Sequence, residues 1–230
     1  ALACSAFVFL LGGGPIEMIC SFIGAGLGNF VRRKLIDRHI TLFACIAVAV
    51  AVACLTYLLS LSLLQLCLHV SSRHEAGYIG AMLFIIPGFP FITSGLDISK
   101  LDMRSGLERM AYAIAIIMVA TLVGWIVTLA VNLRPENFAT LPLSTMAMLL
   151  LRIPASFCGV FGFSIMFNST PRMAAIAGLI GAVANTTRLE LVDLTMIPAG
   201  AAAFIGALVA GLLAAIAKRK VRFPQISITV

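Results

Sequence analysis

Long apolar runs dominate the chain, and polar residues are confined to short stretches between them. A helix needs about 20 mostly apolar residues to cross the hydrocarbon layer of a bilayer. The pattern therefore predicts an all-α polytopic membrane protein with about eight transmembrane segments. The first run is too short to span alone, and the third is long enough to tilt or to project from the membrane. The predicted segments are residues 1–12, 14–31, 40–69, 77–97, 107–132, 143–167, 171–188 and 194–217.

The start of the chain looks like the interior of a helix. There is no starting Met and no basic region before the first apolar run. We therefore expect no signal peptide, and we expect the first helix to begin upstream of Ala1.

Composition supports a membrane protein and excludes several other classes. Of the 230 residues, 61% are apolar and 11% are charged, whereas a soluble domain is about 25% charged. An ordinary soluble enzyme, a disordered chain and a disulfide scaffold are thereby excluded. The net charge of +7 does not indicate nucleic-acid binding, because the basic residues lie between apolar stretches. The six cysteines lack metal-site spacing, so we expect reduced packing residues, and no metal or cofactor.

The basic residues between the runs predict an orientation. Twelve of the sixteen fall in alternate loops, and the opposite loops hold only Arg73, Arg134 and Arg188. Cytoplasmic loops are enriched in Lys and Arg, so we expect the N-terminal side in the cytoplasm of a cell (inner or plasma) membrane. The remaining cation, Arg152, lies in or beside the sixth segment. The twelve are Arg32, Arg33, Lys34, Arg38, Lys100, Arg104, Arg109, Arg172, Lys218, Arg219, Lys220 and Arg222.

Glycine and proline interrupt the apolar sequence at three places. Breaks in a membrane helix free backbone groups that can bind a solute, and in transporters they often mark the binding site. The first and third breaks can equally be tight turns between antiparallel helices, whereas the second, within one apolar run, favours a functional break. The breaks are Gly12-Gly13-Gly14-Pro15, Pro87-Gly88-Phe89-Pro90 and Asn168-Ser169-Thr170-Pro171.

Embedded charges near these breaks are the candidate functional residues. Glu17 follows the first break and is expected either to face a polar cavity or to lie at the outer interface. Asp97, preceded by Thr93 and Ser94, follows the second break and can bind a solute or cap the next turn. Arg152 can neutralise Glu17, bind a carboxylate substrate or extend to the outer interface.

Small residues recur at helical spacing and predict close helix packing. One row holds Gly24 and Gly28, and the other holds Ala203, Ala207 and Gly211. Such faces suit self-association as well as internal packing, so the oligomeric state stays open.

The sequence lacks the parts of a known type of enzyme site. Its three histidines lie at segment ends and outside any H-E-x-x-H pattern, and no paired carboxylates occur at similar depth. We therefore expect no enzyme activity. A channel or a structural membrane subunit stays open as an alternative.

The segment around the second break carries a resemblance to a known family. Residues 86–97 read Ile-Pro-Gly-Phe-Pro-Phe-Ile-Thr-Ser-Gly-Leu-Asp, and residues 106–109 read Gly-Leu-Glu-Arg. They resemble the P-G-x-P-x-x-x-x-x-x-D and G-x-x-R motifs of the threonine/serine exporter family, ThrE. The Gly12-Gly13 pair with Glu17 is similar to that family's G-G-x-x-x-D, with Glu in place of Asp. Residues 161–168 and Pro171-Arg172 resemble the start of the family's C-terminal half.

The resemblance implies a fold and an activity. Members have ten membrane helices in two halves of five, and they export small amino acids by means of the proton-motive force. Two-chain relatives are implicated in dicarboxylate export. The implied halves here are residues 1–134 and 135–230, with about two helices expected after Val230. The loop charges independently place the halves in opposite orientations, as an inverted repeat.

These inferences combine into one hypothesis, a proton-coupled exporter of a small amino acid or a small carboxylate. Glu17 carries the proton, and the Pro87-Gly88 break offers backbone groups to the substrate. Asp97 holds the substrate ammonium or gates the cytoplasmic side, and Arg152 is the candidate partner for a carboxylate. Threonine, serine and a dicarboxylate are not distinguished by the sequence.

Overall fold

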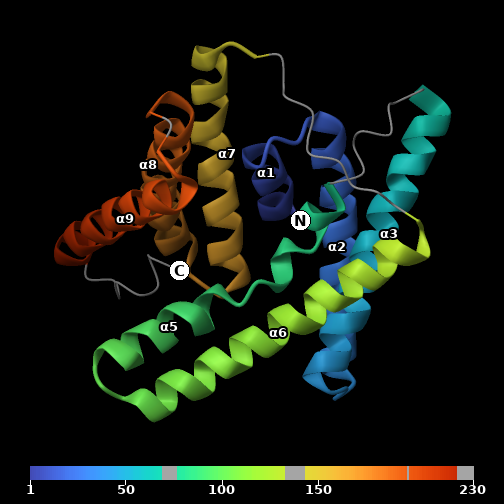
Figure 1. Cartoon of the computed structure of the whole chain (residues 1–230), viewed down its shortest axis with the longest axis horizontal. Helices are drawn as coiled ribbons and strands as arrows, with labels where there is room; N and C mark the ends of the chain where they lie inside the picture. The colour runs from blue at the N-terminus through green and yellow to red at the C-terminus, as the bar shows by residue number, and fades with distance from the viewer. Residues whose placement is uncertain (69–76, 133–142, 196, 222–230) are drawn as a thin grey trace. The chain divides into compact units, whose positions relative to one another are not determined.

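The structure is a computed structural model that describes residues 1–68, 77–132, 143–195 and 197–221 (Figure 1). Every regular element in these ranges is helical. Arg73, Arg134, Arg222, His69 and His74 lie outside the described residues. The elements are α1 (Leu2–Leu10), α2 (Pro15–Asp37), α3 (Leu42–Leu68), α4 (Tyr78–Ala81), the 3-10 turn η2 (Leu83–Ile85), α5 (Gly88–Ser99), α6 (Met103–Ala130), α7 (Thr145–Met166), α8 (Pro171–Thr195) and α9 (Ala199–Val221).

Five helices in the described ranges are long and apolar enough to cross a membrane: α3, α6, α7, α8 and α9. A sixth candidate span consists of α4 with η2, followed by α5, and it bends by 54° at the intervening break. The chain is therefore a multi-pass membrane protein, as the apolar runs predict. Each predicted segment corresponds to a helix or to this broken pair, but α1 and α2, predicted as the first two membrane segments, are not among the candidate spans of the described residues.

Two predicted segment ends fall too early. The second segment is predicted to end at residue 31, but α2 continues to Asp37 and includes Arg32 to Lys34. Cations in the last turns of a helix are favourable, because they oppose the partial negative charge of the helix C-terminus. The seventh segment is predicted to end at residue 188, but α8 continues to Thr195. Arg188 therefore lies inside a helix and not in the loop to which the charge pattern assigns it.

The described helices form two compact units, one within Ala3–Leu141 and the other within Pro142–Val230. The first holds α1 to α6 and the second holds α7 to α9. The boundary expected at residues 134/135 lies outside the described residues and stays a prediction.

In the first unit, α2 packs closely on α3 through the predicted glycine row. A Cβ added at Gly24 would lie 2.7 Å from the carbonyl oxygen of Ala53, and one at Gly28 would lie 2.9 Å from that of Ala49. Only glycine allows the backbones to approach so closely. The packing role predicted for Gly24 and Gly28 is confirmed.

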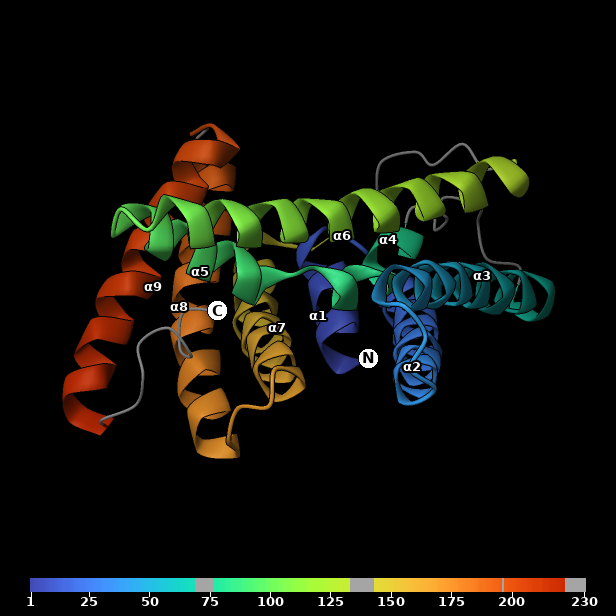
Figure 2. The same ribbon diagram turned by 90° about the horizontal axis from the view of Figure 1, so that it is seen from below.

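The helices α5 and α6 form a second close pair in this unit, and they run side by side in both views (Figure 2). Gly106 permits this approach, because a Cβ there would lie 2.6 Å from the Ile98 side chain and 3.1 Å from the carbonyl oxygen of Ser94. The turn between these helices uses Leu101 at φ 66°. Asp102 then begins α6, where its side chain accepts a hydrogen bond from the Ser105 N–H.

The second unit is built on an α7–α8 hairpin. Asn168, at φ 62°, closes the turn between these helices, so the third break is a tight turn. Gly178 and Gly181 on α8 make room for Phe157 and Val160 on α7. The hairpin places the polar side chains of α7 opposite those of α8.

In the same unit α9 packs on α8, but not through its predicted row. A Cβ at Gly206 would lie 3.0 Å from the Cβ of Arg188, so this unpredicted glycine makes the close approach. A Cβ at Gly211 would meet nothing within 4 Å, which makes its predicted packing role wrong. Ala203 and Ala207 line a groove between the two helices.

Candidate functional site

Glu17 is held in the first turn of α2, directly after the first break. Its side chain is buried, and the carboxylate oxygen Oε2 accepts a hydrogen bond of 2.9 Å from the Gly14 N–H. This bond caps the helix, and Pro15 begins it with a residue that has no N–H to satisfy. Glu17 is thus buried within its unit, and its expected position, facing a polar cavity or at the outer interface, stays a prediction.

The first break itself is a compact turn between α1 and α2. Gly12 adopts φ 101°, which favours glycine. A Cβ at Gly13 would lie 2.5 Å from the Val8 side chain and 3.4 Å from the Cβ of Glu17. Both glycines are therefore needed to bring the chain into α2 with Glu17 in its buried position.

A buried hydroxyl lies one helical turn after Glu17. Ser21 is fully buried, and its Oγ has no hydrogen-bond partner among the described residues. Residues four apart lie on the same face of a helix, so Ser21 follows Glu17 on the buried face of α2. Ser21 was not predicted as a site residue, although its spacing from Glu17 is visible in the sequence.

The second break bends the chain between η2 and α5. Pro87 precedes α5, Pro90 lies in its first turn, and neither has a backbone N–H to donate. The Gly88 N–H donates a hydrogen bond of 3.0 Å to the carbonyl of Ile86, which closes a tight turn at the bend. The break predicted at 87–90 is present in the structure as a bend of 54°.

Thr93 and Ser94 lie in α5, one to two turns after this bend, and both are buried. The Thr93 hydroxyl donates to the carbonyl of Phe89 at 2.9 Å. The Ser94 hydroxyl donates to the carbonyl of Gly106 at 2.7 Å and so ties α5 to α6. Both hydroxyl oxygens can still accept a hydrogen bond from a donor such as an ammonium group.

Asp97 joins α5 to α6 by an ion pair. Its Oδ2 lies 2.9 Å from Nη1 of Arg109, and the two side chains are 23% and 52% exposed. The turn after α5 is closed by the backbone carbonyl of Asp97, which accepts from the N–H groups of Lys100 and Asp102. The carboxylate pairs with Arg109, and the turn depends on the backbone of Asp97.

Arg152 is occupied by two carboxylates on α8. Its Nη1 lies 2.7 Å from Oε1 of Glu190, and its Nη2 lies 2.5 Å from Oδ2 of Asp193. The side chains of Arg152 and Glu190 are 12% and 15% exposed, so this pair is well screened from solvent. Sequence reasoning missed both acids, because only the hairpin brings residues 38 and 41 positions away to Arg152.

A neutral polar pair lies next to these ion pairs on the same two helices. Asn185 Nδ2 donates to Oγ of fully buried Ser156 at 2.9 Å. Ser156 lies one turn after Arg152 on α7, and Asn185 lies about one turn before Glu190 on α8. The α7–α8 interface thus contains a continuous polar row.

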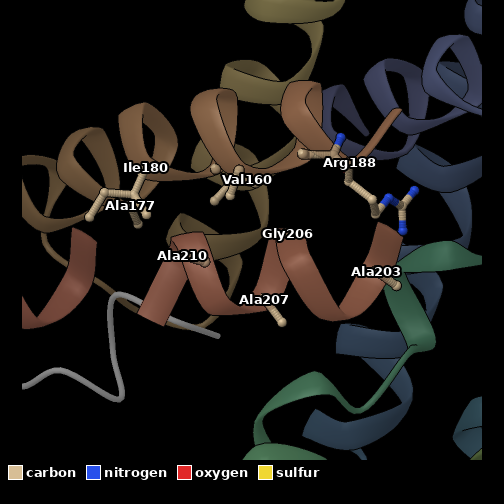
Figure 3. Close-up of a pocket in the computed structure, with 11 residues that line it drawn as sticks. Val160, Ala177, Ile180, Arg188, Ala203, Gly206, Ala207 and Ala210 are labelled. Atoms are coloured by element: carbon tan, nitrogen blue, oxygen red, sulfur yellow. The ribbon is translucent and has the colours of Figure 1, made fainter. Parts of the chain in front are cut away.

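A groove with polar lining lies between α8 and α9, with a contribution from α7 (Figure 3). It has a volume of about 260 Å³. Small side chains form most of its wall, and Asn185 and Arg188 are its polar members.

The predicted residues therefore divide between the units. Thr93, Ser94 and Asp97 share α5, and Glu17 lies in α2 of the same unit. Arg152 belongs to the second unit, and its neutralisation of Glu17 stays a prediction. Among the described residues no group of three or more His, Cys, Asp or Glu could hold a metal ion, and the six cysteines are free thiols.

Two family models match the chain, over residues 1–132 and residues 152–230. Both are described as threonine/serine exporters, the first named ThrE and the second ThrE_2. The chain belongs to the threonine/serine exporter family. The resemblance based on residues 86–109 is thereby confirmed, and it extends to both ends of the sequence.

The chain is also similar to one curated protein of Escherichia coli (strain K12), named "Probable succinate transporter subunit YjjP". The two are 26% identical over 132 residues, which is 56% of this chain. The chain spans about half the length of that relative (49%). No solved structure shows significant similarity to the chain.

Proposed function

We propose that the protein exports small amino acids such as threonine and serine across the cell membrane, driven by the proton gradient. Membership of the exporter family supports export. The observation that carries the proposal is the buried Glu17 carboxylate at a helix break, with the Ser21 hydroxyl one turn away. Ionisable groups inside membrane proteins commonly mark proton relays and substrate pathways.

Protonation of Glu17 is coupled in this proposal to the conformation of the first break. As a carboxylate it accepts the Gly14 N–H and lies at the N-terminus of α2, where the helix dipole favours negative charge. Protonation removes that charge and weakens this bond, so the α1–α2 turn loosens. Proton uptake at Glu17 thus favours the conformation with the loosened α1–α2 turn, and proton release favours the conformation in which the Gly14 N–H is capped.

The α5–α6 pair carries the residues that we expect to contact the substrate in the same unit. A substrate ammonium competes with Arg109 for the Asp97 carboxylate, and Thr93 and Ser94 lie one turn earlier on the same helix. Breaking the Asp97–Arg109 pair would remove one of the ties between α5 and α6, while the turn between them keeps its backbone hydrogen bonds. In this way Asp97 serves both as ammonium ligand and as gate. We propose that this end of α5 faces the cytoplasm, as the loop charges predict.

A second candidate is export of a small dicarboxylate. The similarity to a relative whose name specifies succinate favours it. A dicarboxylate has no ammonium for Asp97, so it would depend on cationic side chains instead.

Transport from preloaded proteoliposomes tests these proposals. The vesicles contain labelled threonine, serine or succinate, and efflux is measured with and without a protonophore. The proposal predicts that threonine or serine is lost faster than succinate. The protonophore should abolish this excess loss. Loss of succinate alone would favour the second candidate. Efflux that is insensitive to the protonophore would indicate a channel, and absence of all efflux would indicate a structural subunit.

A further inference from the structure

The α8–α9 groove is large enough to hold a small solute. Its volume is about 260 Å³, slightly below the range of about 300–1,000 Å³ that is usual for drug-sized ligands. Alanines and glycines of both helices form most of the wall, and Val160 and Ile180 are its larger apolar residues. Figure 3 shows Arg188 near one end of the groove, close to Ala203 of α9.

Arg188 is the cation of this groove, and the described residues hold no ion-pair partner for it. The nearest acids along α8, Glu190 and Asp193, are both bound to Arg152. Arg188 lies two turns before the end of a candidate membrane span. A cation at such a position is costly unless it meets an anion or water.

The groove is built to hold the Arg188 side chain along its wall. Gly206 on α9 faces the stem of Arg188, since a Cβ there would lie 3.0 Å from Cβ and 3.5 Å from Cγ of the arginine. A larger residue at 206 would push the guanidinium away from α9. The glycine therefore keeps the charged group beside the groove.

Asn185 is the second polar group, three residues before Arg188 and so on nearly the same face of α8. Its Nδ2 donates to Ser156, which fixes the side chain and leaves the amide oxygen as an acceptor. A guanidinium and a fixed amide are matched to a small acid, because the guanidinium binds a carboxylate through two parallel hydrogen bonds. The amide oxygen can accept from an ammonium or a hydroxyl.

We propose that the α8–α9 groove is a binding site within the second unit, distinct from the Asp97 contact of the first, and that it binds the carboxylate group of the exported solute, with Arg188 as its ligand and the alanine and glycine wall against its apolar part. This inference rests on the proposed exporter function and names the group that the solute must carry. Arg188 replaces Arg152 as the candidate ligand for the solute carboxylate, because Arg152 is already neutralised by two carboxylates.

Equilibrium binding of labelled threonine and succinate to the protein in phosphatidylcholine vesicles tests the site. Arg188→Gln should raise the Kd of both solutes at least about tenfold, the usual cost of losing a charge-assisted hydrogen bond. Arg188→Lys should recover part of the affinity, since it retains charge without the two parallel bonds. Arg172→Gln is the matched control, because Arg172 is an exposed arginine at the start of the same helix.

An analogue without the carboxylate provides a second readout. Wild-type protein should bind serine more tightly than serinamide, and Arg188→Gln should bind the two about equally. Ala203→Leu should also weaken binding by filling the groove, whereas Ala201→Leu, an exposed position of α9 outside the groove, should not. These variants keep the test decisive even if Arg188→Gln melts at a lower temperature.

Several results would overturn the proposal. Unchanged Kd values in Arg188→Gln, or equal losses in Arg172→Gln, would remove Arg188 from solute binding. An Arg188 effect seen only in vesicles with phosphatidylglycerol would assign the guanidinium to a lipid phosphate. Proton-driven export by wild type and Arg188→Gln alike would refute this site and spare the exporter function. Arg188-dependent binding without proton-driven flux would refute the coupling and spare the site.

Discussion

Glu17 and Ser21 lie one turn apart on the buried face of α2, and they differ in how their polar groups are satisfied. Glu17 accepts the Gly14 N–H, whereas the Ser21 hydroxyl has no partner among the described residues. An unsatisfied buried hydroxyl costs about 1–3 kcal/mol. An unsatisfied buried hydroxyl in a folded protein calls for an explanation, and a role in binding or in proton movement is one.

Ser21→Ala tests that role. The substitution removes the unsatisfied group, so the free energy of unfolding should stay the same or rise by about 1 kcal/mol. Proton-driven export should nevertheless fall, because the hydroxyl beside Glu17 is gone. Thermal melting in detergent and efflux from proteoliposomes measure the two effects. Ser62→Ala, at an exposed position of α3, is the control, and full export by Ser21→Ala would show that Ser21 has no functional role.

Arg152 is expected to stabilise the second unit. Arg152→Gln leaves Glu190 without its cation in a shielded position, so the free energy of unfolding should fall by about 3 kcal/mol. Melting experiments on the purified protein measure this loss. The double variant Arg152→Met with Glu190→Met should recover part of it. A variant that melts like wild type but no longer binds carboxylates would instead return Arg152 to the role of substrate ligand.

At the scale of elements, the α2–α3 pair depends on a contact that only glycine permits. Gly24→Ala would place a methyl group 2.7 Å from the carbonyl oxygen of Ala53. The helices must separate, at a cost of about 1–3 kcal/mol. The matched control is Gly211→Ala in α9, where a Cβ meets nothing within 4 Å and helix propensity predicts a gain of about 1 kcal/mol. Equal melting temperatures for the two variants would contradict the packing described here.

The α5–α6 pair is joined by the Asp97–Arg109 ion pair, which is proposed to open for a substrate ammonium. Asp97→Asn should weaken binding of threonine and serine at least about tenfold, because a charge-assisted contact is lost. Binding of succinate, which has no ammonium, should change much less. Competition binding in proteoliposomes distinguishes these cases, with Asp37→Asn at an exposed site as control. A similar loss for all solutes would assign Asp97 to structure and not to the ammonium.

At the scale of the whole molecule, the long apolar runs were sufficient to predict the helices, because a membrane helix is specified by local composition. The broken span at 87–90 and the glycine row on α2 were also visible, since both depend on neighbouring residues in one segment. The Arg152–Glu190 pair and the groove at Arg188 were not, because they exist only when α7, α8 and α9 pack together. The end of α8 was misplaced because the charged residues at 188–193 resemble a loop until the pairing of Glu190 and Asp193 with Arg152 on α7 is known.

The chain belongs to the threonine/serine exporter family, and coupling to protons is the central claim of the proposed function. Glu17→Gln is the sharpest variant for this claim. Glutamine can still accept the Gly14 N–H as a neutral group, so the fold should be retained while the α1–α2 turn adopts the looser arrangement proposed for protonated Glu17. The side chain can no longer exchange a proton.

The most direct measurement is therefore threonine transport by Glu17→Gln in proteoliposomes, with gradient-driven flux and solute exchange at equal pH followed in parallel. We predict that gradient-driven flux falls to the level of empty vesicles while exchange continues. Glu108→Gln, at an exposed position of α6, should behave like wild type in both assays. Gradient-driven flux that survives in Glu17→Gln would contradict the account and place the coupling proton elsewhere.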